Sequence, residues 1–209
     1  MAFTLADRPL RDVLSEFASP APTPGGGAAC ATASALGAAL LVMAASLAHT
    51  RSGSSDDRPA LDAARLVLAD IERQLIEAID ADSAAYGRVI AARKQPKVTG
   101  AEQAARAAAI QQALREATDV PLGLMRLSAA ALEQARPVAA HAHRAAESDV
   151  AVAITLLRAG FEGARLTVDA NLRVAIDASD VGAVRGECRR LSEQADAAVS
   201  EAERLLRFE

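Results

Sequence analysis

The sequence has very few aromatic residues: only 2% of its 209 residues are aromatic, with one Tyr, four Phe and no Trp. It also lacks runs of β-branched and aromatic residues bounded by turn residues, which argues against a β-sheet. Ala, Leu, Arg, Glu and Gln are abundant instead, and these residues favour helices. We therefore predict an all-α fold in which small side chains let the helices approach closely.

Cysteine is also scarce, since the chain has only Cys30 and Cys188, far apart and in no CxxC pair. Small secreted domains that rely on disulfides have more cysteines than this. The N-terminal residues MAFTLADRPLRD contain no apolar core of a signal peptide. We expect reduced thiols and a cytoplasmic location.

Positive charge is not concentrated in any segment, and the net charge is -4 with 24% charged residues. Nucleic-acid surfaces use clustered Lys and Arg, often with aromatic side chains between them. Neither pattern is present, so no nucleic-acid partner is expected. The 51% apolar content is that of a globular chain rather than a disordered one.

No Asp, Glu, Lys or Arg occurs between Phe17 and Thr50, a run long enough to cross a membrane. The run consists mostly of Ala, Gly, Ser and Thr, and it lacks the aromatic belts and flanking Lys clusters of a membrane span. A helix that is apolar all round is also typical of a buried position. We therefore predict a buried helix after Gly27 and no membrane partner.

The remaining sequence predicts further helices by its apolar periodicity and by its start and stop signals. The first two are a short amphipathic helix with Leu10, Val13, Leu14 and Phe17, and a long helix over 59–92. The others are a helix that starts at a Thr99–Glu102 capping box and is ended or bent by Pro121 and Pro137, a helix capped by Ser148–Asp149, and a last helix with Val184, Cys188, Leu191, Ala195 and Val199 inward.

These segments predict a bundle of about six helices, with long Ala-rich buried helices, in one domain over residues 1–209. Three of the helices are apolar around more of their circumference than a monomer of this size can cover. We therefore expect a homodimer or a higher homo-oligomer.

A carboxylate interrupts the apolar row of the long helix over 59–92. Apolar residues recur there every seven positions, at Leu61, Leu68, Leu75 and Val89. Asp82 occupies the missing place in this row, and Tyr86 follows one turn later. An ionised carboxylate on a buried row is costly unless it is paired or functional. Two readings stay open: a structural ion pair or hydrogen bond, and a functional acid or base.

Two further polar features lie at helix positions. Asn171 continues an apolar row of the helix that Ser148–Asp149 is expected to cap. A hydrogen bond across the bundle explains a polar residue in that row without a ligand. The triplet Gly25–Gly27 opens the buried helix, so its backbone N–H groups could hold a carboxylate or a phosphate. A tight turn explains the triplet equally well.

The three histidines do not form a metal-binding pattern. His141 and His143 are two positions apart, which places them on different faces of a helix, and His49 is remote in sequence. No other Cys or His cluster completes a ligand set, so we expect no metal. The sequence also contains no GxSxG, Walker A or GxGxxG motif.

The segment ASPAPTPGGG at 18–27, followed by an Ala-rich helix with LGAAL at 36–40, resembles the cyclodeaminase/cyclohydrolase family. That family includes the C-terminal domain of formiminotransferase-cyclodeaminase and free-standing methenyltetrahydrofolate cyclohydrolases. The blocks that support the resemblance extend over nearly the whole chain: DADSAAY at 80–86, QPK at 95–97, ATDVPL at 117–122, SDVAVA at 148–153 and NL at 171–172. The chain departs from the family at HTRSG (49–53), where a Lys-rich stretch is usual, and at HAHR (141–144).

The resemblance implies an enzyme that acts on the one-carbon bridge between N5 and N10 of tetrahydrofolate, without a metal or redox cofactor. The implied activity is that of a methenyltetrahydrofolate cyclohydrolase or a formiminotetrahydrofolate cyclodeaminase, with a tetrahydrofolate derivative as substrate. Asp82 is the expected catalytic residue, because a buried carboxylate can move protons among the reacting groups. The expected substrate-binding residues are Gly25, Gly26, Gly27, Tyr86, Lys97, Asp149 and Asn171.

Two other functions stay open at this point. The chain could be a family member without turnover that serves as a ligand-binding or assembly protein. It could also be an enzyme for a different substrate, in which His49, His141 or His143 supplies the acid or base. The absorbance of methenyltetrahydrofolate, followed with and without the protein, separates an enzyme from a non-enzyme.

Overall fold

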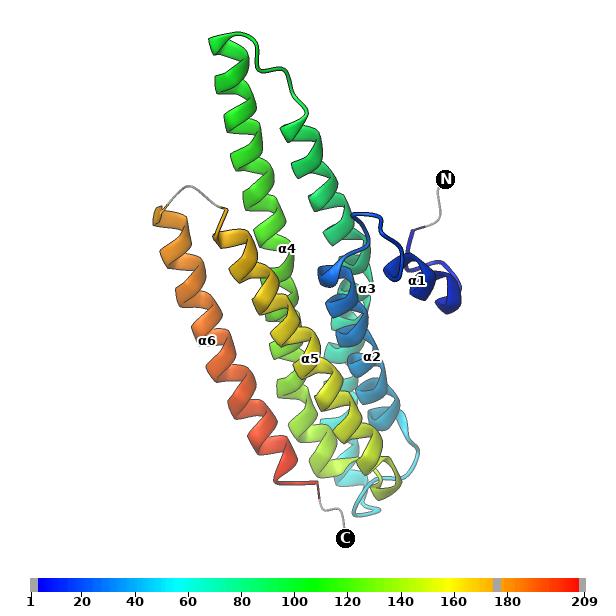
Figure 1. The fold of residues 1–209 in the computed structure, drawn as a ribbon. Helices are drawn as coiled ribbons and strands as arrows, with labels where there is room; N and C mark the ends of the chain where they lie inside the picture. The colour runs from blue at the N-terminus through cyan, green and yellow to red at the C-terminus, as the bar shows by residue number, and fades with distance from the viewer. Residues whose placement is uncertain (1–3, 175–177, 207–209) are drawn as a thin grey trace.

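The computed structural model describes residues 4–174 and 178–206, and within these ranges it forms an elongated bundle of six α-helices (Figure 1). Two short 3-10 helices and one isolated bridge between Thr50 and Ala142 are also present there, but no strand is. The all-α prediction is confirmed. The α-helices are α1 (Leu10–Phe17), α2 (Gly26–Ser46), α3 (Arg58–Arg93), α4 (Gly100–His141), α5 (Glu147–Leu172) and α6 (Ala178–Glu203), and the 3-10 helices are η1 (Ser55–Asp57) and η2 (Arg144–Ala146).

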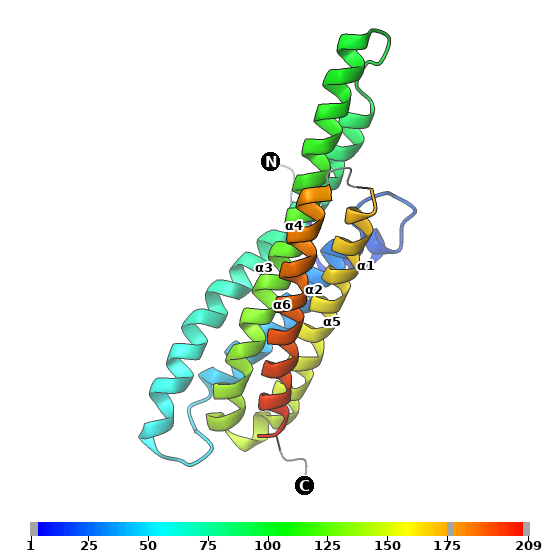
Figure 2. The ribbon, with the colours of Figure 1, turned by 90° about the vertical axis from the view of Figure 1, so that its left-hand side faces the viewer.

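Helix α2 lies between α3 and α5, with α4 behind it and α6 against α4 (Figures 1 and 2). Helix α2 is long and apolar enough to cross a membrane, but a buried core helix of a soluble protein can have the same length and composition. One side of α2 is fully buried, and it includes Ala28, Ala38, Leu41 and Ala44. Ser34 on this side shares a buried hydrogen bond of 2.8 Å with Ser128 of α4.

Glycine lets α5 approach the backbone of α2. A Cβ atom added at Gly160 would collide with the Ser34 hydroxyl and would stand 2.7 Å from the backbone oxygen of Cys30. From the other helix, a Cβ atom at Gly37 would stand 2.8 Å from the backbone oxygen of Ala153. Neither position leaves room for a methyl group, so the small residues set the spacing between the two helices.

The predicted heptad row of α3 faces the core. Leu61, Leu68, Leu75 and Val89 are all buried, and so are Ala64, Ile71, Ala85 and Ala92 in the neighbouring row. Beyond the body of the bundle, α3 and α4 continue together as a projecting hairpin with its own small core of Val89, Ala92, Ala113 and Leu114 (Figures 1 and 2). At the tip, the expected capping box is present: Glu102 N–H donates to Thr99 Oγ1 at 3.2 Å, and Thr99 N–H donates to Glu102 at 2.8 Å.

Helix α4 continues through Pro121 and Pro137 to His141, so neither proline ends it, and the bend that the sequence also allowed stays a prediction. The expected cap of the next helix was wrong. Helix α5 begins at Glu147 without a side-chain cap, so Ser148 and Asp149 lie inside its first turn, where a carboxylate still favours the helix dipole. The predicted short helix α1 is present, with Val13 buried and Leu10 and Leu14 66% and 59% exposed.

Gly160→Ala tests the close packing of α2 and α5. Because the added methyl group meets the backbone of Cys30, we expect a loss of about 1–3 kcal/mol in the free energy of unfolding. Gly123→Ala in α4 is the matched control, since a Cβ atom there meets nothing within 4 Å. It should stabilise the helix by about 1 kcal/mol. Urea unfolding of both variants measures the difference, and equal stabilities would contradict this packing.

Candidate active site

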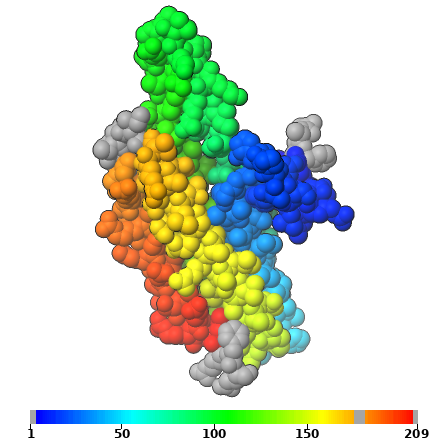
Figure 3. Space-filling view, in the orientation of Figure 1, coloured from blue at the N-terminus to red at the C-terminus, as the bar shows by residue number. Residues whose placement is uncertain are grey.

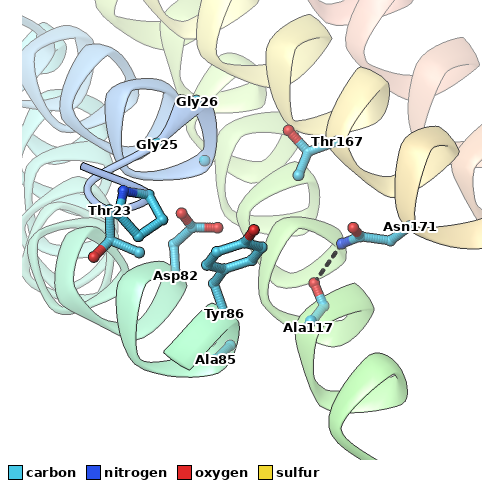
Figure 4. Close-up of a pocket in the computed structure, with 11 residues that line it drawn as sticks. Thr23, Gly25, Gly26, Asp82, Ala85, Tyr86, Ala117, Thr167 and Asn171 are labelled. Carbon is cyan, nitrogen blue, oxygen red and sulfur yellow. Dashed lines mark hydrogen bonds between the residues drawn. The ribbon is translucent and has the colours of Figure 1, made fainter. Parts of the chain in front are cut away.

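A pocket of about 340 Å³ opens where α2 begins and where α3 and α5 run on past it (Figure 4). Its volume is in the range of small-molecule sites. Five segments supply the lining: the chain before α2, the first turn of α2, the middle of α3, and facing parts of α4 and α5. The lining residues are Pro22, Thr23, Gly25, Gly26, Gly27, Asp82, Ala85, Tyr86, Ala117, Thr167 and Asn171.

The glycine triplet forms the start of α2 and one wall of the pocket. Gly25 is the extended residue before the helix, and Gly26 and Gly27 are its first residues. The N–H groups of a first helical turn have no partner within the helix, so they are available to a ligand oxygen. A Cβ atom at Gly27 would collide with the Asp82 carboxylate, and only glycine therefore lets that carboxylate sit against the helix.

Asp82 projects from α3 toward the start of α2, and its carboxylate accepts a hydrogen bond of 3.2 Å from the backbone N–H of Ala28. Asp82 makes no ion pair in the described residues, so a structural ion pair is excluded there. Two interpretations stay open: a structural hydrogen bond to a neighbouring helix, and a functional acid or base. Burial raises the pKa of Asp82, and the bond from Ala28 lowers it by a smaller amount. A carboxyl group whose pKa is raised by burial in a cleft is a candidate acid or base.

Asn171 is held in place by a gap in the hydrogen-bonding of α4. The Ala117 carbonyl would normally accept from the N–H four residues later, but that residue is Pro121, which has none. Asn171 Nδ2 donates to this carbonyl at 2.7 Å. The predicted cross-bundle bond of Asn171 is therefore confirmed, and Figure 4 shows its amide oxygen turned away from Ala117.

Thr167 and Tyr86 complete the polar lining. The Thr167 hydroxyl donates to the Gly163 carbonyl at 3.0 Å, which leaves its oxygen as an acceptor toward the pocket. Tyr86 stands beside Asp82 on α3 and is 42% exposed, so its ring is accessible to a bound molecule (Figure 4). The pocket thus presents N–H donors at α2 and acceptor oxygens at α5, with a carboxyl group between them.

The structure does not bring Lys97 or Asp149 to this pocket within one chain. Lys97 follows the end of α3, and the helical rise from Asp82 to Arg93 alone is about 17 Å. Asp149 is in the first turn of α5 and Asn171 in its last, about 33 Å apart along the helix. Of the expected site residues, the pocket gathers Asp82, Gly25–Gly27, Tyr86 and Asn171.

Sequence reasoning did not select Thr167 as a site residue. The available signal was its spacing, since Thr167 is four residues before Asn171 and shares its helix face. A threonine on a half-buried helix face is ordinary by itself, so this spacing becomes informative only once Asn171 is placed in a pocket.

The histidines lie at the opposite end of the bundle from Asp82. His141 Nδ1 is 2.7 Å from Asp57, which also accepts from the Ser52 hydroxyl and N–H, and these bonds hold the pKa of Asp57 well below its usual range. The His49 and His143 rings are edge to face at 6.1 Å. Across residues 4–174 and 178–206, no three His, Cys, Asp or Glu side chains are grouped as metal ligands would be.

Comparison with known proteins gives a consistent result. The family model described as formiminotransferase-cyclodeaminase matches residues 9–190. A methenyltetrahydrofolate cyclohydrolase of Methylorubrum extorquens is 38% identical over 160 residues, covering 77% of each chain. A formimidoyltransferase-cyclodeaminase of Sus scrofa is 32% identical over 196 residues, which is 92% of this chain but only 36% of that longer protein.

A solved structure supports the fold. The formiminotetrahydrofolate cyclodeaminase of Thermotoga maritima superposes with a TM-score of 0.84, covering 95% of this chain and 96% of the other. Its sequence identity is 23%, so this comparison concerns the fold alone.

The link between Pro121 and Asn171 can be tested by a double-mutant cycle. Asn171→Ala leaves the Ala117 carbonyl without a partner, so we expect it to lower the free energy of unfolding by about 1–3 kcal/mol. In a Pro121→Ala background the added N–H can bond that carbonyl, and the same change should cost clearly less. Urea unfolding of the four proteins gives the coupling, and an equal cost in both backgrounds would refute the link.

Proposed function

The chain belongs to the formiminotransferase-cyclodeaminase family, and we propose that it is a methenyltetrahydrofolate cyclohydrolase whose acid and base is Asp82. The observation that carries this proposal is the half-buried Asp82 carboxylate, held by Ala28 N–H in a polar pocket of a size suited to a small molecule. The cyclohydrolase relative supports the choice of reaction, because this chain matches it over 77% of its length.

The proposed reaction opens the methenyl bridge with water. Water attacks the bridging carbon while Asp82 takes one of its protons, and a tetrahedral carbon with a hydroxyl group forms. The bond from this carbon to N5 then breaks, Asp82 returns its proton to N5, and the hydroxyl proton leaves to solvent as the 10-formyl group forms. The raised pKa of Asp82 suits both steps, since the group must accept and release a proton.

The other pocket residues bind the substrate in this proposal. Asn171 and Thr167 offer acceptor oxygens to the N–H groups of the pterin ring, and Tyr86 stacks on the ring or orients Asp82. The N–H groups of Gly26 and Gly27 receive an oxygen of the substrate. Lys97 is not assigned to this pocket, because it lies beyond the end of α3.

Cyclodeamination is the second candidate, and the cyclodeaminase relatives favour it. Here N10 of 5-formiminotetrahydrofolate attacks the formimino carbon and its proton passes to the formimino nitrogen, and protonated Asp82 supplies the second proton with which that nitrogen leaves as ammonia. The same carboxyl group serves both reactions. The vertebrate relatives are about three times as long as the matched segment, so the transferase activity in their names is not assigned to this chain.

We also propose the conditions under which this enzyme works. The chemistry above uses no metal or redox cofactor. Both cysteines are free thiols, which suits the cytoplasm. Helix α2 is strongly apolar, yet only 44% of its most apolar window is buried in one chain, which favours a homodimer or a higher homo-oligomer. A nucleic-acid or membrane partner is not part of the proposal.

Asp82→Asn separates function from folding. We expect turnover, followed by the loss of methenyl absorbance above the spontaneous rate, to fall about 100-fold or more. The melting temperature should stay the same or rise, since an amide oxygen can still accept from Ala28 N–H. Asp80→Asn is the control: it removes the charge of a carboxylate that accepts from Leu5 N–H outside the pocket, and it should keep turnover. A lower melting temperature with retained turnover would make Asp82 structural.

The pH dependence should follow the raised pKa of Asp82. As the base, Asp82 must be ionised, so kcat/KM should fall as the pH drops through a midpoint above the ordinary Asp value of about 3.9. The protonated carboxyl of Asp82 stabilises the folded protein at a pH below the pKa that Asp82 has in the unfolded chain. This stabilisation is lost as the pH rises through the higher pKa that Asp82 has in the folded protein. Asp82→Asn should therefore melt higher than the wild type at neutral pH, and this difference should vanish in acid.

A further inference from the structure

Helix α4 contains two prolines, Pro121 and Pro137, and each leaves one backbone carbonyl without its usual N–H partner. The two freed carbonyls have different surroundings. The one freed by Pro137 belongs to Glu133, on an exposed face of α4 where water can satisfy it. The one freed by Pro121 belongs to Ala117, which lines the pocket and accepts a hydrogen bond of 2.7 Å from Asn171 Nδ2.

The Ala117 carbonyl fixes which way the Asn171 amide points. A carbonyl oxygen only accepts hydrogen bonds, so it must meet the NH2 group of the amide and not the amide oxygen. The amide oxygen is therefore turned away from Ala117, as Figure 4 shows. With any other residue in place of Pro121, a backbone N–H would occupy the carbonyl, and the amide would be free to turn either end to a ligand.

Thr167, one turn before Asn171 on α5, is committed in a similar way. Its hydroxyl hydrogen goes to the Gly163 carbonyl at 3.0 Å, so its oxygen is left as an acceptor toward the pocket. Residues four apart on a helix have their Cβ atoms about 5–6 Å from each other. The α5 wall of the pocket therefore presents two neighbouring acceptor oxygens.

The pocket can take a flat ring between these oxygens and the start of α2. Figure 3 shows this side of the molecule, where the surface is hollowed between the start of α2 and the end of α5, with α4 behind. A ring in this hollow meets the backbone N–H groups of Gly26 and Gly27 on one side and the two α5 oxygens on the other. The edge of the ring that faces α5 must therefore donate.

We propose that Pro121 is a positioning residue that selects the substrate ring through Asn171. By leaving the Ala117 carbonyl to Asn171, Pro121 keeps the amide oxygen available to the ligand. This oxygen and that of Thr167 accept from two neighbouring N–H groups of the ring. The inference rests on the proposed function, since the N3–H and the 2-amino group of a tetrahydropterin are neighbours and both donate. A ring without one of these donors leaves an acceptor of the pocket unpaired and binds more weakly.

Pro121 acts at a distance from the ligand. Its side chain is fully buried and lies outside the pocket lining, so its influence on the pocket passes through the Ala117 carbonyl. Alanine favours the interior of a helix far more than proline does. We therefore expect Pro121→Ala to fold and to release the Asn171 amide.

Side-chain amide NMR tests the orientation of Asn171 without any substrate. Its NH2 signals, identified by their loss in Asn171→Asp, should exchange slowly with solvent in the wild type, because the Ala117 carbonyl holds this group. In Pro121→Ala the exchange should be at least tenfold faster. Equal exchange rates in the two proteins overturn the inference.

Calorimetric titration with 5-formyltetrahydrofolate, a stable tetrahydropterin, tests the selection. Pro121→Ala should bind it about 3- to 10-fold more weakly, which is the cost of fixing a side chain that is no longer held. With methenyltetrahydrofolate as substrate, KM should rise by a similar factor while kcat stays within twofold. Pro137→Ala is the matched control and should bind as the wild type does. Equal binding by all three proteins overturns the inference.

A carboxylate at position 171 tests orientation against a merely structural role of Pro121. In Asn171→Asp alone, a carboxylate oxygen faces the Ala117 carbonyl, and this repulsion should weaken binding at least tenfold. In Pro121→Ala/Asn171→Asp the new N–H bonds the carbonyl and either carboxylate oxygen can accept, so binding should return to within about threefold of the wild type. The double variant remains informative if Asn171→Asp alone fails to fold. Binding by the double variant that stays tenfold or more below the wild type overturns the inference.

The ligand itself separates this inference from the proposed function. An analogue of 5-formyltetrahydrofolate with a methyl group in place of the 2-amino group should bind the wild type at least tenfold more weakly, and equal binding overturns the inference. A wild type that makes this distinction but does not open methenyltetrahydrofolate supports the inference and refutes the proposed reaction.

Discussion

The close approach of α2 to α3 and α5 is the constraint on which the rest of the structure depends. Gly37 and Gly160 let two helix backbones come near contact, and Gly27 lets the Asp82 carboxylate reach the first turn of α2. Because α2 starts at Gly26 while α3 and α5 continue past it, the space that α2 would have filled becomes the pocket. The same small residues thus determine both the core and the site.

Backbone groups, rather than other side chains, orient the polar groups of the pocket. Asp82 is held by the N–H of Ala28, Asn171 by the carbonyl of Ala117, and Thr167 by a carbonyl of its own helix. A backbone group does not change its position by choosing another rotamer, so these contacts preorganise the site. They also leave one side of each polar group available to a substrate.

The sequence was informative where a polar residue interrupts a regular spacing of apolar residues. Asp82 interrupts a seven-residue row, and that interruption is visible without any tertiary information. Lys97 and Asp149 lie outside the pocket, because nearness in a sequence motif does not account for helical rise over a long helix. The sequence left open whether α4 continues through Pro121 for a related reason: the partner of the freed carbonyl, Asn171, comes from a distant helix.

The projecting hairpin of α3 and α4 is joined to the bundle only through the continuation of its two helices. Its own core consists of Val89, Ala92, Ala113 and Leu114, too few buried side chains to match the stability of the main core. Local opening is easiest where few apolar contacts must break. Amide hydrogens near the tip should therefore exchange with solvent much sooner than those around Asp82, so the hairpin can fray and re-form while the rest of the molecule stays folded.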